Sequence, residues 1–177
     1  MSFDASDSKA ECLPAMRQRC HARRMKKWMF FWMALGLMPG MIATGSAQER
    51  GNWHATSRTA QSITGDVAFG NEKMILNLTS FPFAEIRSLN ATEFMAMFDG
   101  AQASAGAGHL YRVSIAGERR FLRKNTLCGG EDVQWMATYS TGKQLEIAMF
   151  SSATPPVLSV EALNGSTNLC GTFSYAR

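Results

Sequence analysis

The chain has 177 residues and a formal net charge of +4, from 18 Lys and Arg against 14 Asp and Glu. Residues 1–47 hold seven of these bases and three of the acids, which leaves eleven of each in residues 48–177. The basic character thus belongs to the first 47 residues. A neutral remainder argues against nucleic acid or an anionic membrane surface as a partner.

Residues 1–47 have the order of a secretory signal peptide. A basic cluster over 17–27 precedes an apolar run over 28–38, then Pro39 and Gly40, and small residues at 45–47. This order predicts a protein that is exported to the periplasm or beyond and cleaved before Gln48. An uncleaved anchor is the alternative, but the apolar stretch over 28–43 falls short of the roughly 20 residues that a spanning helix needs.

The first 15 residues precede the basic cluster and do not look like part of a signal. We therefore take them as a mis-assigned start, with Met16 or Met25 as the candidate first residue. Residues 48–177 are then a single exported domain, of a length typical for one hydrophobic core.

Two cysteines, Cys128 and Cys170, lie in this exported part. In an oxidising compartment and with no competing cysteine, they predict a disulfide that closes a loop of about 43 residues and contributes roughly 4 kcal/mol in the chain-entropy model. A metal site is the alternative. Two cysteines are too few for one, and neither His54 nor His109 has a ligand-like spacing from them, so we expect no metal and no cofactor.

In chain order, the first half predicts a strand at 53–59, a hairpin of 65–69 and 73–79 around Gly70-Asn71, a break or edge at 81–83, and a helix over 92–98 with Thr92 as N-cap. Period-two alternation dominates the second half. It predicts strands at 111–115, 121–127, 133–139, 145–149 and 169–175, with a turn of helix at 160–163.

Seven or eight short strands with little helix predict an all-β antiparallel meander that closes into a small barrel or folds into a sandwich, with one short helix and one disulfide. Its expected core aromatics are Trp53, Trp135, Phe173 and Tyr175. Alternation places Trp135 on an inner face with Val133, Ala137 and Tyr139, packed against Phe173 or Tyr175, and places Gln134, Met136 and Thr138 on the wet face.

His54 and His109 are the only imidazoles after residue 47, so a hydrolase would depend on one of them. Acidic or nucleophilic residues that could join them are Ser57, Ser62, Asp66, Asp99 and Ser104. No G-x-S-x-G motif accompanies them, and both histidines are predicted on the wet face, so no catalytic residue is assigned. The one basic cluster, Arg119, Arg120, Arg123 and Lys124, is expected on a solvated strand face.

Two resemblances accompany these patterns. Gly51-Asn52-Trp53 is similar to the G-x-W that opens lipocalin barrels, in which the Trp plugs one end. The stretches NTLCGG (125–130) and LCGTFSY (169–175), together with the turn at 63–66, Trp53 and Trp135, resemble small exported bacterial proteins of unassigned function. The second resemblance implies export and the disulfide, and it implies no activity.

The leading functional hypothesis is a small exported, non-enzymatic binding protein. Its partner would be an apolar small molecule, a cell-envelope component or a secreted hydrolase that it inhibits. The alternative is a structural or assembly protein of the envelope, and a hydrolase that uses His54 or His109 is the third. A hollow barrel would favour a small ligand, whereas a solid core beside an exposed apolar surface would favour a structural role.

Overall fold

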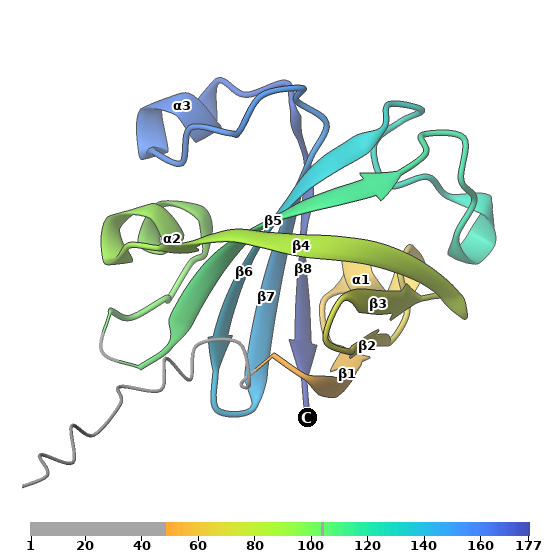
Figure 1. Cartoon of the computed structure of the whole chain (residues 1–177), viewed down its shortest axis with the longest axis horizontal. Helices are drawn as coiled ribbons and strands as arrows, with labels where there is room; N and C mark the ends of the chain where they lie inside the picture. The colour runs from red at the N-terminus through yellow and green to blue at the C-terminus, as the bar shows by residue number, and fades with distance from the viewer. Residues whose placement is uncertain (1–48, 104) are drawn as a thin grey trace, which may run out of the picture. The chain divides into compact units, whose positions relative to one another are not determined.

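The structure, a computed structural model, describes residues 49–103 and 105–177. Eight antiparallel strands close into a barrel in chain order, and the last strand pairs with the first (Figure 1). The predicted all-β architecture is confirmed, in its barrel form. The expected signal peptide over residues 1–47 and Ser104 lie outside the described residues.

Three tight turns and four longer connections join the strands of the barrel. The strands are β1 (Gly51–Ala55), β2 (Val67–Phe69), β3 (Lys73–Leu76), β4 (Thr79–Leu89), β5 (Ala107–Ile115), β6 (Val133–Thr141), β7 (Gln144–Phe150) and β8 (Leu169–Ala176). The helical segments are α1 (Arg58–Ser62), α2 (Ala91–Met97), α3 (Val160–Asn164) and the 3-10 turn η2 (Leu122–Lys124).

Three local predictions in these loops and strands were wrong. The strand expected over 53–59 ends at Ala55, because Ser57 caps the helix α1 that begins at Arg58. Pro82 does not break the sheet, because it lies within β4 opposite Lys73 of β3. Residues 121–127 form no strand. Arg123 and Lys124 take positive φ values there, which a strand does not allow, and β5 pairs directly with β6 instead.

Buried apolar side chains form two separate clusters. The first fills the barrel, and its members include Trp53, Tyr111, Met136, Phe173 and Tyr175. The second lies outside the barrel wall, beneath α2 and α3, and its members include Phe94, Leu110, Trp135, Tyr139 and Phe150. All four predicted core aromatics are thus buried, but Trp135 belongs to the outer cluster.

The predicted contact of Trp135 with Phe173 or Tyr175 was therefore wrong. The reason is that β6 is buried on both faces. Met136 and Thr138, expected in water, point into the barrel and are fully buried, while α2 covers Tyr139, whose ring stacks on Phe94 with centroids 4.8 Å apart. Alternation predicts faces only when one of them is wet.

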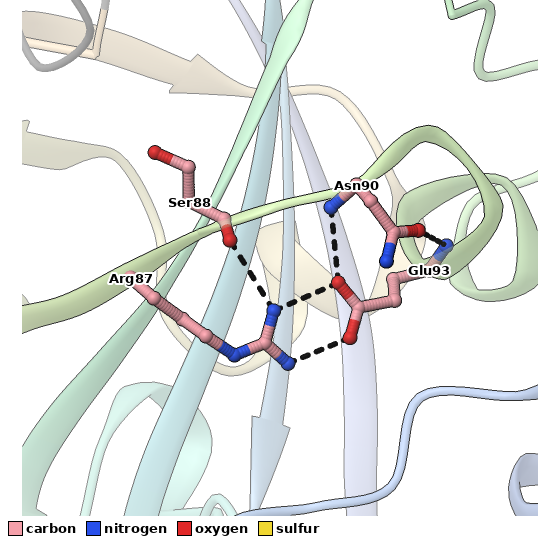
Figure 2. Close-up of polar contacts among 4 residues, drawn as sticks. All are labelled: Arg87, Ser88, Asn90 and Glu93. Atoms are coloured by element: carbon pink, nitrogen blue, oxygen red, sulfur yellow. Dashed lines mark hydrogen bonds and ion pairs between the residues drawn. The ribbon is translucent and has the colours of Figure 1, made fainter.

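Helix α2 begins with a capping box. The Asn90 side chain accepts from the Glu93 backbone N–H at 3.0 Å, and the Glu93 carboxylate accepts from the Asn90 N–H at 2.9 Å (Figure 2). Arg87 at the end of β4 donates to both oxygens of the same carboxylate, at 2.8 and 2.6 Å. The N-cap is hence Asn90 and not Thr92 as predicted, and α2 is held against β4 from its first turn.

The disulfide joins Cys128 to Cys170 with their Cα atoms 4.7 Å apart, as predicted. Cys170 lies at the start of β8, whereas Cys128 lies in the connection between β5 and β6. The bond therefore fastens a long loop to the barrel wall. We call this the disulfide end of the barrel. The opposite end, which we call the N-terminal end, holds the start of β1 and the β2–β3 and β6–β7 turns.

Candidate functional site

Polar side chains gather inside the N-terminal end of the barrel. His109 and Tyr111 alternate along β5, and Thr138 and Ser140 alternate along β6. His109 lies directly opposite Thr138 in the register, and all four side chains are buried. Alternation places them on the inner wall, where the rest of the barrel is apolar. We call these residues, with Glu49 and Glu85, the barrel-end cluster.

Glu49 closes this end from a segment that precedes the first strand. Its carboxylate accepts hydrogen bonds from the Tyr111 hydroxyl at 2.5 Å and from the Thr138 hydroxyl. Its backbone carbonyl accepts from the Trp53 indole N–H at 2.7 Å. Only 2% of Glu49 is exposed. Burial raises the pKa of this carboxyl, and the hydroxyl bonds from Thr138 and Tyr111 oppose that rise.

His109 is held by Glu85 on the neighbouring strand. Its Nδ1 lies 2.8 Å from Glu85 Oε1, and 3% of its side chain is exposed. The prediction that His109 lies on the wet face was wrong. The alternation that buries Tyr111 and Val113 buries His109 as well, because the three residues are two apart along β5. The Nε2 atom is buried and has no partner among the described residues.

The cluster borders a small cavity of about 80 Å³. Glu49, Glu85 and Tyr111 line it together with Phe69 and Phe83. Burial, and then the neighbouring Glu49, raise the pKa of the Tyr111 hydroxyl, so this group stays protonated as a donor. The arrangement therefore presents two hydroxyl groups to the Glu49 carboxylate and the His109 imidazole to the Glu85 carboxylate. Across residues 49–103 and 105–177, no three Asp, Glu, His or Cys side chains gather in a way that would hold a metal ion.

A larger hollow of about 610 Å³ lies outside the barrel, and we call it the outer hollow. Residues that line it include His54, Asp66, Ile75, Leu78 and Leu122. His54 Nδ1 lies 2.9 Å from Asp66 Oδ2, and 75% of the His54 side chain is exposed, as predicted. The Ala55 backbone N–H and then His54 hold the pKa of the Asp66 carboxyl below its usual value.

Leu78 forms one wall of the outer hollow and is 98% exposed. It is the second residue of the turn between β3 and β4, and both turn residues have positive φ, 46° at Asn77 and 62° at Leu78. Such a turn favours Asn and Gly. Leucine at this position carries backbone strain and exposes a large apolar side chain.

The structure places the remaining predicted candidates apart from both features. Ser57 caps α1, because its hydroxyl accepts from the Ala60 and Ser174 backbone N–H groups at 3.2 and 3.1 Å. The predicted basic cluster is on a loop instead of a strand face: Arg119 donates to the Thr79 hydroxyl, and Arg123 lies in η2. Phe94 of α2 and Phe98, which follows this helix, are both buried.

Sequence reasoning missed four members of the barrel-end cluster: Glu49, Glu85, Thr138 and Ser140. Glu49 carries no local signal for burial because Glu is normally exposed, as Glu85 is with 36% of its side chain accessible, and Thr138 was assigned to the wet face. The burial of His109 could have been predicted from its spacing of two residues from Tyr111. The burial of Glu49 could not, because only the closed barrel brings Glu49 to β5 and β6.

Among the described residues, no helix is long and apolar enough to cross a membrane. No family model matches the chain, and no curated protein or solved structure matches it either. Functional inference for this protein therefore rests on its own geometry.

Proposed function

We propose that this chain is a small exported, non-enzymatic protein that binds a protein partner on the outer hollow. The partner is a component of the cell envelope or a secreted hydrolase that the chain inhibits. The packed barrel supports a protein partner over an apolar ligand. Large side chains such as Trp53, Phe173 and Met136 fill its interior and are fully buried, and the cavity at its N-terminal end measures about 80 Å³.

The exposed Leu78 is the observation that carries this proposal. Its side chain contributes little to the core, because 98% of it is exposed. Its backbone also occupies a region that costs a leucine roughly 1–2 kcal/mol. Folding alone would favour Gly or Asn at this turn. An apolar side chain kept there despite the strain, beside Ile75 and Leu122, fits a residue that a partner covers.

The hydrolase hypothesis receives less support from the geometry. His54 pairs with Asp66 in the outer hollow, but the nearby Ser57 hydroxyl already accepts two backbone N–H groups as the cap of α1. His109 lies inside the closed end of the barrel, where 3% of its side chain is exposed. Among residues 49–103 and 105–177, neither imidazole hydrogen-bonds to a serine, threonine or cysteine side chain.

The test compares Leu78→Asn with the matched control Val157→Asn. Both positions are exposed and apolar, but Val157, 71% exposed, lies in the β7–β8 connection, away from the outer hollow. The purified protein would be assayed for inhibition of representative secreted glycosidases, serine proteases and zinc proteases, and for binding to detergent-extracted envelope proteins. We expect Leu78→Asn to weaken the interaction at least tenfold and Val157→Asn to preserve it. Equal binding by both variants would reject the outer hollow as the docking surface.

A structural role in the envelope is the second candidate. The solid core beside exposed Leu78 and Ile75, the latter 44% exposed, favours it. The two roles differ in their stoichiometry. An inhibitor would block its enzyme at one copy per enzyme, whereas an assembly protein would co-sediment with envelope fragments and leave hydrolase activity unchanged.

A further inference from the structure

The barrel wall binds the carboxylate of Glu49, a residue that belongs to none of the barrel strands. The two hydroxyls that hold Glu49 belong to β5 and β6, where Tyr111 and Thr138 point inward. Glu49 itself precedes β1, whose first residue in the sheet, Gly51, pairs with Phe69. Burying an ionised carboxylate is costly unless it is hydrogen-bonded. The barrel thus carries a preformed set of donors, and an appended segment fills it.

The wall holds one more hydroxyl than Glu49 uses, because Ser140 Oγ is buried and has no partner among the described residues. His109 Nε2 is buried and unpartnered as well, but it accepts when Nδ1 donates to Glu85. Both side chains are on the inner wall, because His109 alternates with Tyr111 and Ser140 alternates with Thr138. Buried polar atoms are normally satisfied, so the unpartnered Ser140 hydroxyl on the same wall as Thr138 indicates room for a further acceptor.

The surroundings of the donors define the class of ligand. The rings of Phe69, Phe83 and Tyr111 form an apolar wall of the 80 Å³ cavity. The ring centroids of Phe69 and Phe83 are 5.8 Å apart, and those of Phe83 and Tyr111 are 5.0 Å apart. We propose that the barrel-end cluster is a binding site for a short-chain monocarboxylate, which takes the place of Glu49 when the segment before β1 withdraws. The hydroxyls would hold the carboxylate of this ligand and the aromatic rings its carbon chain. The site is separate from the outer hollow and does not depend on the function proposed there.

Glu49 and Arg50 precede β1, so their withdrawal would break no strand pairing. Among the described residues, their backbone carbonyls accept from the Trp53 indole N–H and from Arg177 Nη2, the latter at 2.6 Å. In the native chain Glu49 competes with an external ligand as a tethered group, at an effective concentration in the millimolar range or above. The native protein should therefore bind the external carboxylate more weakly than a variant without Glu49.

Removal of the internal carboxylate tests the proposal. Glu49→Ala would be purified from cells that export it and titrated with sodium acetate, propionate and butyrate against sodium chloride at equal ionic strength and pH. We expect its melting temperature to rise with carboxylate concentration, and its apparent affinity to exceed that of the native protein at least tenfold. A second change in the same protein, Tyr111→Phe, should weaken the response because it removes one donor.

Two controls separate the site from general effects of carboxylate salts. Glu49→Gln refills the same space with an uncharged group and should not respond. Glu146→Ala removes another partly buried carboxylate, which accepts from Ser174 at 2.8 Å outside this cluster, and should not respond either. An equal response from all variants, or a folded Glu49→Ala that ignores all three acids, would overturn the proposal. If Glu49→Ala does not fold, the acids should restore its far-ultraviolet circular dichroism, and failure to do so would equally overturn it.

Discussion

Arg177 at the end of the chain lies over the ring of Trp53 near its beginning, with Cζ 3.8 Å from the ring centroid. The same guanidinium donates to the Arg50 carbonyl. Trp53 in turn donates its indole N–H to the Glu49 carbonyl. The seam between β1 and β8 is therefore closed at the N-terminal end by contacts between the two ends of the domain.

Loss of this contact should weaken the seam. We expect Arg177→Ala to lower the free energy of unfolding by about 1 kcal/mol, the usual range for a cation–π contact at an exposed site. Arg58→Ala is the matched control, because Arg58 is an exposed arginine of α1. Urea titration measures both. An equal effect of the two substitutions would show that Arg177 contributes only its charge.

Stability should depend on pH through Glu49. Burial raises the pKa of its carboxyl above the ordinary 4.5. Between 4.5 and this raised value the folded state keeps a proton that the unfolded chain has lost, so the free energy of unfolding should fall as pH rises. Glu49→Gln has no proton to release and should lack this decline. Urea titrations between about pH 4 and pH 8 give the free energy of unfolding of both proteins. In the difference between the two, the contributions of other carboxyls such as Glu146 cancel. A difference that does not change with pH would contradict the raised pKa.

The disulfide should be the main covalent support of the disulfide end. Non-reducing peptide mapping should recover Cys128 linked to Cys170, and a double replacement by Ala should lower the free energy of unfolding by roughly 2–4 kcal/mol. Free thiols at both positions in the folded, exported protein would refute the bond.

Substitutions on the two faces of β6 test its double burial. Trp135 packs in the outer cluster and Met136 in the barrel, with 6% and 0% exposed. We expect Trp135→Ala to cost roughly 3–5 kcal/mol and Met136→Ala roughly 2–5 kcal/mol, because each leaves a cavity. Denaturant titration decides the point. If Met136→Ala lowers the free energy of unfolding by less than about 0.5 kcal/mol, as is typical of a surface site, β6 would be buried on one face only, as alternation predicts.

Export with cleavage remains a prediction from residues 17–47. The mass of the exported protein should correspond to a new N-terminus at or close to Gln48. This result would also leave Glu49 near the free end of the chain, as its role at the barrel end requires. A full-length product retained in the membrane would contradict cleavage.

Local signals in the sequence suffice for several parts of this fold. Two cysteines after residue 47, with no other to compete, predict the bond between Cys128 and Cys170. Alternation predicts the strands that become β6, β7 and β8. It also predicts a strand over 121–127 that does not form, and it gives no strand over 84–89, where β4 continues. Alternation acts between near neighbours in the chain, and the cysteine signal depends on a residue type with one dominant chemistry in an oxidising compartment.

Tertiary structure alone decides the faces of β6 and the contents of the barrel-end cluster. Trp135 turns outward because α2 and α3 supply a second apolar layer there, and no short-range pattern in β6 encodes that cover. Glu49 is buried because the closed barrel brings it to Tyr111 and Thr138, which are 62 and 89 residues away in the chain. The sequence by itself determines most of the strands and the disulfide. Packing between distant segments determines which side chains meet inside the barrel, because the burial of a strand face depends on the elements that cover it.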